Sequence, residues 1–240
     1  MSGHSKWATI KRKKGLIDAE RGKIFQKLAK EIMVAAKGTD GNLDNNPSLR
    51  MVVDKAKAAN MPKDRIESAI EKATKSSGGE DYEFVRYEGY GPNGVAIMVD
   101  CLTDNRNRTA AAVRSTFTKR GGNLGTDGSV SYMFERKGVI VIPNTYSEDE
   151  VMTIALENDA LDFVTSDDSY EITTTPEDFV KVNKALEQAN ITDFIMNEVR
   201  FIPSNYISLE EDKTTKIMGL IDALEELDDV SDVYHNLEID

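Results

Sequence analysis

The sequence predicts a multidomain α+β protein, with an N-terminal three-helix domain and two ferredoxin-like α+β domains, one inserted in the other. Its 240 residues exceed the roughly 100–200 residues that one domain usually takes. Apolar residues follow a helical period as far as residue 75, and they alternate as in strands beyond a Ser/Gly linker at 76–79. The order strand, helix, strand, strand, helix, strand over 138–203 is that of a ferredoxin-like domain.

The N-terminal domain, residues 1–78, begins with an arm at 1–16 that has no sustained apolar period. The first predicted helix has one apolar face, formed by Phe25, Leu28, Ile32 and Ala36. A second helix starts at Asn46-Pro47, since proline favours the first helical position. Asn60-Met61-Pro62 separates it from a third helix. Short connections between three amphipathic helices predict a small helical domain.

The middle domain is predicted to consist of residues 79–137 and 204–240, with 138–203 inserted between them. Its first part has strands at 84–90 and 94–102, a helix at 109–120 and a strand at 129–135, and its second part has a helix at 211–227 and a strand at 230–237. The inserted segment is complete in itself, so the flanking elements are expected to form the second α+β layer. A simple serial order of domains is the alternative interpretation.

Composition argues against several functional classes. One cysteine, Cys101, and two histidines leave little for disulfides, multi-cysteine zinc sites or general-base catalysis. Cys101 lies in an apolar strand and is expected in the core. We therefore expect a protein that is not an enzyme and has no catalytic residue, cofactor or metal. Apolar runs are too short to span a bilayer, and the basic N-terminus does not fit a secretory signal, so a cytoplasmic protein without a membrane partner is expected.

Charge is divided unevenly along the chain, whose net charge is −12. Residues 1–78 hold 17 basic and 9 acidic residues, whereas residues 139–240 hold 5 basic and 25 acidic residues. Such asymmetry suggests that the basic part meets a polyanion, which the acidic part would repel. Nucleic acid is therefore the expected partner. The acidic region is interpreted as a solvated surface, with a basic protein as the alternative partner for it.

The basic arm holds one aromatic residue, Trp7, among five cations: Lys6, Lys11, Arg12, Lys13 and Lys14. Cations that neutralise phosphates release counterions and so bind nucleic acid without regard to sequence, and an aromatic ring gives a base a surface for stacking. The structural alternative is that Trp7 fills an apolar gap in the helical domain. Arg21 and Lys23 continue the positive charge onto the first helix.

A second predicted contact lies in the segment from Asp104 to Thr109, which holds Arg106 and Arg108. Thr109 or Asn107 is expected to cap the helix that follows, and two arginines beside helix N-terminal amides would favour an anion. The alternative is a capping loop with exposed arginines. The glycine-rich stretch 121–128 lacks the spacing of a phosphate-binding or dinucleotide loop, so it is interpreted as a tight helix-to-strand connection.

Long motifs across essentially the whole chain resemble the YebC/PmpR family. They are GHSKWATIKRKK (Gly3 to Lys14), DKAKAANMPKD (Asp54 to Asp64), YEGYGPNGVAI (Tyr87 to Ile97), LTDNRNRT (Leu102 to Thr109) and RGGNLGTDGSVSYMF (Arg120 to Phe134). The resemblance implies three domains and a DNA-binding regulator of transcription. Mitochondrial relatives imply a translational activator, and bacterial members a ribosome-associated, RNA-binding factor that helps synthesis through proline-rich stretches. No helix-turn-helix is recognisable in the sequence, and an irregular basic arm suits structured RNA.

Overall fold

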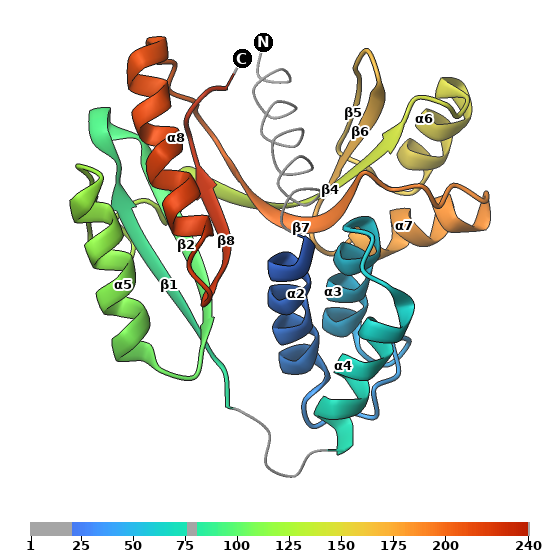
Figure 1. Ribbon diagram of the computed structural model, residues 1–240. Helices are drawn as coiled ribbons and strands as arrows, with labels where there is room; N and C mark the ends of the chain where they lie inside the picture. Colours follow the sequence, from blue (N-terminus) through green and yellow to red (C-terminus); the bar gives the residue numbers. More distant parts are fainter. Residues whose placement is uncertain (1–20, 76–80, 240) are drawn as a thin grey trace. The chain divides into compact units, whose positions relative to one another are not determined.

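The computed structural model describes residues 21–75 and 81–239 (Figure 1). The chain divides into two compact units, one made of the described residues up to 34, from 81 to 135 and from 202 onward, the other of residues 35–75 and 136–201. Each unit contains one four-stranded sheet. Three elements cross the division: α2 (Arg21–Ala36), β4 (Phe134–Pro143) and β7 (Met196–Pro203).

The sheet of the first unit has the strand order β3-β1-β2-β8. Its strands are β1 (Glu83–Tyr90), β2 (Ala96–Thr103), β3 (Asn123–Leu124) and β8 (Val230–His235). All three pairings are antiparallel, and the register places Tyr87 opposite Val99 and Val99 opposite Val233. The turn predicted between the first two strands is the short 3-10 helix η1 (Pro92–Gly94). The two central strands therefore form a hairpin.

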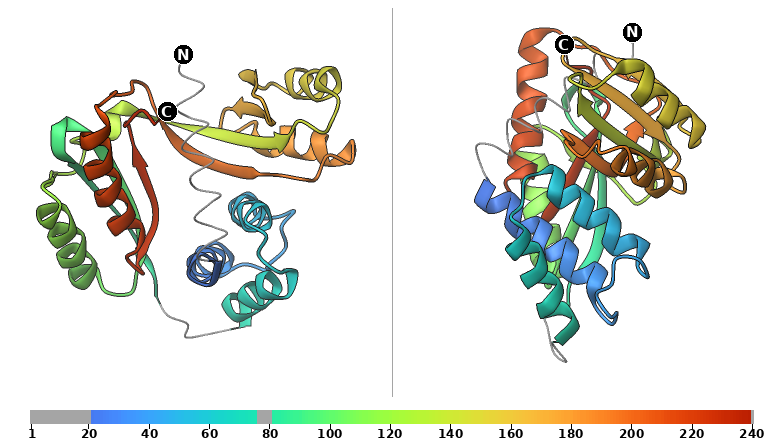
Figure 2. Two further views of the ribbon diagram at one scale, coloured as in Figure 1. Left: turned by 45° about the horizontal axis from the view of Figure 1, so that its top comes forward. Right: turned by 90° about the vertical axis from the view of Figure 1, so that its right-hand side faces the viewer.

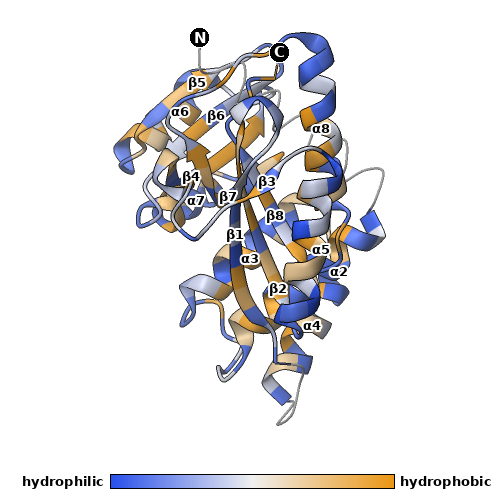
Figure 3. Ribbon diagram, turned by 90° about the vertical axis from the view of Figure 1, so that its left-hand side faces the viewer, coloured by the Kyte–Doolittle hydropathy of each residue, from blue (hydrophilic) through white to orange (hydrophobic). Residues whose placement is uncertain are grey.

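Helices α5 (Arg106–Lys119) and α8 (Glu211–Glu225) cover one face of this sheet (Figures 1 and 2). The core between them is apolar and closed to solvent, with contributions from Ile97, Val99, Cys101, Val113, Phe117, Ile217 and Leu220. Figure 3 shows hydrophobic residues, in orange, recurring along the strands and hydrophilic residues, in blue, recurring along α8. Burial of this apolar area is what holds the two helices to the sheet.

The predicted strand at 129–135 is wrong. Ser131–Met133 is a 3-10 helix, η2, and the strand that follows it, β4, starts at Phe134. The physical reason is a buried carboxylate, because Glu88 accepts hydrogen bonds from the backbone N–H groups of Gly128, Val130 and Ser131. Backbone donors that are held by a side chain cannot pair with a neighbouring strand. The fourth strand of the first sheet is instead β3, within the glycine-rich stretch.

The sheet of the second unit has the order β5-β6-β4-β7, with α6 (Glu148–Glu157) and α7 (Phe179–Gln188) as its helices. Its other strands are β5 (Asp162–Thr165) and β6 (Ser169–Thr174). The central pair, β4 and β6, is separated in sequence by α6 and β5, which is the ferredoxin-like arrangement predicted for this segment. Ile140, Ile142 and Ile172 from the strands pack with Phe179, Val182 and Leu186 from α7.

Two further helices, α3 (Pro47–Ala58) and α4 (Lys63–Lys75), belong to the second unit. Asn46 caps α3 by accepting a 3.0 Å hydrogen bond from the Leu49 N–H, and Pro47 occupies the first helical position. Asn60, with φ 59°, reverses the chain between the two helices. N-terminal helices followed by two antiparallel four-stranded sheets confirm the predicted α+β class, while the predicted domain boundaries stay a prediction. None of the helices in the described ranges is long and apolar enough to cross a membrane.

Candidate nucleic-acid interface

Most of the predicted contact residues precede the part of the chain that the structure describes. Lys6, Trp7, Lys11, Arg12, Lys13 and Lys14 lie outside the described residues, which begin at Arg21. Their role stays a prediction from the sequence. Four other predicted residues are placed, namely Arg21 and Lys23 on α2 and Arg106 and Arg108 on α5.

Helix α2 carries two further cations, Lys27 and Lys30, after Arg21 and Lys23. Arg21 is exposed and Lys23 is half-buried. Lys27 donates a 2.6 Å hydrogen bond to the backbone carbonyl of Glu225, and Lys30 donates one of 3.1 Å to the carbonyl of Asp228. Because α8 ends at Glu225, the carbonyl of that residue lies at the negative end of the helix dipole and attracts the Lys27 ammonium group, whereas the Asp228 carbonyl lies beyond the helix. Burial, with the neighbouring charge of Lys23, lowers the pKa of Lys27.

Arg106 and Arg108 lie inside α5 rather than in a loop before it, so the predicted helix start at 109 is three residues late. The cap is Asn105, whose side chain accepts a 3.0 Å hydrogen bond from the Arg108 N–H. The predicted caps, Thr109 and Asn107, are therefore wrong. Thr109 is buried instead, and its hydroxyl lies 2.8 Å from the Thr103 hydroxyl and donates to Asp229 at 2.8 Å.

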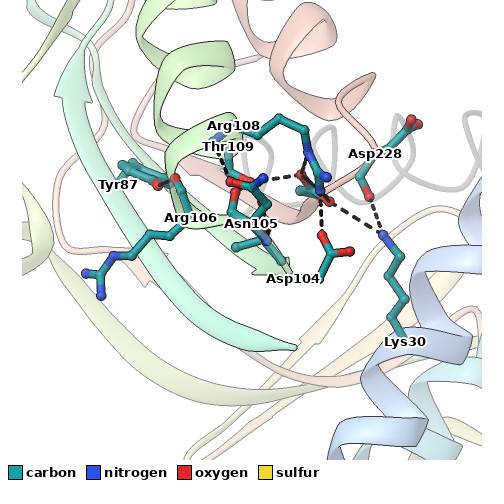
Figure 4. Close-up of polar contacts among 10 residues, drawn as sticks. Lys30, Tyr87, Asp104, Asn105, Arg106, Arg108, Thr109 and Asp228 are labelled. Carbon is teal, nitrogen blue, oxygen red and sulfur yellow. Dashed lines mark hydrogen bonds and ion pairs between the residues drawn. The ribbon is translucent and has the colours of Figure 1, made fainter. Parts of the chain in front are cut away.

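Arg108 is held by two carboxylates (Figure 4). Its Nη2 donates to Asp104 Oδ1 at 2.8 Å and to Asp229 Oδ2 at 2.8 Å, and its Nε lies 3.2 Å from Asp229 Oδ2. Lys30 Nζ lies 3.7 Å from Asp229 Oδ1, so one carboxylate collects contacts from α2 and α5. Burial alone would raise the pKa of Asp229, but the hydrogen bonds from Arg108 and Thr109 outweigh it and lower that pKa.

Arg106 points away from this cluster (Figure 4). Its side chain is 66 % exposed, and Nη1 lies 4.0 Å from Glu83 Oε2. The two predicted arginines therefore do not converge on one point. Arg108 links α5 to the segment before β8 although its side chain is 53 % exposed, and Arg106 faces solvent beside Glu83. A phosphate contact by either residue stays a prediction.

Sequence reasoning missed two organising carboxylates, Glu88 and Asp229. Glu88 accepts backbone hydrogen bonds of 2.8–3.0 Å from three residues of the segment 128–131. Burial of Glu88 opposes ionisation, yet these three donors lower its pKa. The available signal was that Glu88 is the one acid on its face of β1, which it shares with Arg86 and Tyr90, since side chains two apart share a face. The glycine-rich stretch itself has positive φ at Gly121 and Gly128, as predicted for a tight connection.

Neither a metal cluster nor a reactive thiol is found among the residues that the structure describes. There, no group of three or more His, Cys, Asp or Glu side chains is arranged to hold a metal ion. Cys101 is fully buried in the core of the first unit, as predicted, and burial raises the pKa of its thiol to about 12. A thiol with such a pKa stays protonated at neutral pH and is a poor nucleophile.

Comparison with known proteins places the whole chain in one family. The family descriptions "TACO1/YebC protein N-terminal domain" and "TACO1/YebC second and third domain" match residues 5–76 and 82–237. The chain belongs to the TACO1/YebC family. This TACO1/YebC protein is 56 % identical over 241 residues to a protein of Geobacillus thermodenitrificans, covering 99 % of the chain and 97 % of that relative. It is 52 % identical over 240 residues to a protein of Borreliella burgdorferi, covering 100 % and 98 %.

Both relatives carry the name "Probable transcriptional regulatory protein". Among solved structures, the TACO1/YebC chain is similar to the crystal structure of a conserved hypothetical protein from Aquifex aeolicus. The TM-score is 0.80, the sequence identity is 44 %, and the match covers 93 % of both chains. The resemblance deduced from the motifs is thereby confirmed. The name of the relatives labels the family as regulatory rather than enzymatic.

Proposed function

We propose that this protein is a non-enzymatic regulator of gene expression that binds nucleic acid in the cytoplasm. The observation that carries the proposal is the division of charge, with 17 basic against 9 acidic residues in 1–78 and 5 against 25 in 139–240. Lys6, Trp7, Lys11, Arg12, Lys13 and Lys14 are assigned the main contacts, and Arg21 and Lys23 extend them onto α2. The acidic region would be repelled by phosphates, so only the basic region meets the polyanion.

The first candidate is a DNA-binding transcriptional regulator. The names of the relatives in Geobacillus and Borreliella support it. Counterion release from phosphates would supply most of the affinity, which makes binding strongly dependent on salt. Sequence preference would then have to come from a few base contacts or from the shape of the duplex.

The second candidate is a factor that binds ribosomal RNA and assists translation, and one feature of α4 favours it. A helix that reads DNA in the major groove needs side chains available to phosphates and base edges. In α4, which follows α3 after a short turn, Lys63 lies 3.6 Å from Glu67 and Lys75 pairs with Glu71. These pairs bring acids to the helix surface, which disfavours a close approach to duplex DNA. Structured RNA can instead be bound by an irregular basic arm.

Binding of labelled DNA and RNA tests the proposal. The full chain is compared with the variant K11A/R12A/K13A/K14A at near-physiological salt by fluorescence anisotropy. We expect the variant to bind about ten-fold or more weakly, and its plot of log affinity against log salt to be shallower, because phosphate contacts are lost. The matched control K181A/K184A/K213A/K216A removes the same charge from the acidic region and should bind as the wild type does. Equal binding by the variant and the wild type would overturn the assignment.

A further inference from the structure

Helix α5 and the residues that follow it form the longest acid-free basic stretch beyond the N-terminal region. The chain has 42 acids among 240 residues, more than one in six, yet the 22 residues of 105–126 contain none. Five cations fall in this stretch: Arg106, Arg108, Arg114, Lys119 and Arg120. The stretch belongs to the first unit, whose last segment, 202–240, is strongly acidic. The positive charge of 105–126 therefore stands in contrast to the acidic segment 202–240 of the same unit.

The five cations fall into two groups according to their partners. Arg106 and Arg108 lie near carboxylates, as described above. Arg114, Lys119 and Arg120 are exposed, and within the described ranges none of the three forms an ion pair. Some exposed lysines on other helices are paired, since Lys63 pairs with Glu67 and Lys213 lies 2.9 Å from Glu210. The C-terminal half of α5 thus presents charge that the described fold does not use.

The packing of α5 fixes where this charge points. Val113 and Phe117 are fully buried against the sheet, which sets the inner face of the helix. At about 100° per residue, Ala111, Ser115 and Thr118 lie on the opposite face, with Arg114 on one side of them and Lys119 on the other. All three of these small residues are exposed. The exposed face of α5 therefore carries a row of small side chains, with Arg114 on one side of the row and Lys119 on the other.

We infer that this outer face of α5, flanked by Arg114 and Lys119, is a further phosphate-contact surface, which binds the phosphodiester backbone of a nucleic acid. The inference rests on the proposed function and adds a site to it. Small side chains allow a sugar–phosphate backbone to approach closely, and flanking cations neutralise its charge. Because the strip lacks long polar side chains for base edges, its contacts position the nucleic acid without reading its sequence. DNA and RNA share this chemistry, and the experiment below includes both.

The test uses the full chain with two charge-matched double variants. R114Q/K119Q removes the two flanking cations, and K181Q/K184Q removes two exposed cations from α7. Arg120 is left intact because its Nη1 would lie only 3.3 Å from a Cβ on Gly219 of α8, so the side chain packs against that helix. Thermal melts of both variants establish that they fold as the wild type does.

Affinity for a short labelled DNA duplex of mixed sequence and for a labelled RNA hairpin is measured over a range of salt. For R114Q/K119Q we expect weaker binding to at least one probe and a salt slope that falls in magnitude by roughly two, about one per lost phosphate contact. The control K181Q/K184Q should keep the wild-type slope. An R114Q/K119Q slope equal to that of the control, beside a wild type that binds and a K11A/R12A/K13A/K14A variant that binds about ten-fold or more weakly, would overturn this inference alone. A wild type that binds neither probe would overturn the proposed function.

Discussion

Asp229 lies in the short connection between α8 and β8, and its carboxylate contacts three other side chains. Its side chain is only 12 % exposed, and it accepts hydrogen bonds from Arg108 and Thr109 while Lys30 lies 3.7 Å away. The carboxylate therefore ties α2 and α5 to the end of α8. Periodicity in the sequence could predict these helices, but it could not identify a contact between residues 108 and 229. Such a pair becomes visible only once the strand order is known.

The lowered pKa of Asp229 predicts how acid affects stability. A carboxyl whose pKa is lower in the folded protein stabilises it above the unfolded value of about 3.9, and that contribution is lost as the pH falls through the folded pKa. We expect D229N to reduce the free energy of unfolding by about 1–3 kcal/mol near neutral pH. The difference between D229N and wild type should shrink as the pH falls below about 4 in urea titrations.

The control for this prediction is D104N. Asp104 also accepts a hydrogen bond from Arg108, but its side chain is 46 % exposed, so solvent screens the pair. Its loss should change the free energy of unfolding by about 0–1 kcal/mol at any pH. A D229N difference that stayed constant down to about pH 3 would show that the carboxylate charge is not what stabilises the junction.

At the scale of elements, the helices and strands with strong periodicity were predictable, as were the turns marked by glycine, proline and asparagine, but the segment 129–133 was not. The ferredoxin-like order was predicted from four strand-like segments, now β4, β5, β6 and β7, with a helix after the first and after the third. The structure confirms this order. The strand predicted at 129–135 failed because a single side chain, Glu88, holds the backbone donors of that segment. Strand propensity is a property of the residues within a segment. The conformation of 129–135 depends instead on Glu88, which lies some 40 positions earlier in the chain.

Two glycines, in β4 and in α2, predict opposite effects of the same substitution. A Cβ on Gly138 in β4 would lie 2.7 Å from Phe179 Cδ2 and would also clash with Thr174, so G138A should destabilise the protein by roughly 1–3 kcal/mol. At Gly22 in α2, no described residue beyond its own stretch of helix has an atom within 4 Å of that position, and alanine restricts the unfolded chain. G22A should therefore stabilise the protein by about 0.5–1 kcal/mol. Urea unfolding followed by circular dichroism measures both, and a neutral G138A would contradict the packing of α7 on β4.

At the scale of the whole molecule, the distribution of charge was the informative signal. Net charge alone, −12, would argue against a nucleic-acid partner, but the division between residues 1–78 and 139–240 reverses that argument. The sequence could also predict that Arg106 and Arg108 sit near a helix start. It could not predict that Arg108 pairs with Asp104 and Asp229, because both the cap at Asn105 and the nearness of α5 to the β8 connection depend on the fold. The same packing leaves Arg114 and Lys119 exposed on α5 without an ion pair among the described residues.

The central claim, that the basic N-terminal region binds nucleic acid, is tested most directly by sedimentation in competition. The wild type and K11A/R12A/K13A/K14A are each mixed, at near-physiological salt, with ribosomes and a large excess of mixed genomic DNA fragments. We predict that the wild type is retained by one of the two and that the variant is released from it. Retention by DNA would favour the transcriptional candidate, and retention on ribosomes despite the DNA would favour the translational one. Identical behaviour of the wild type and the variant would contradict the account.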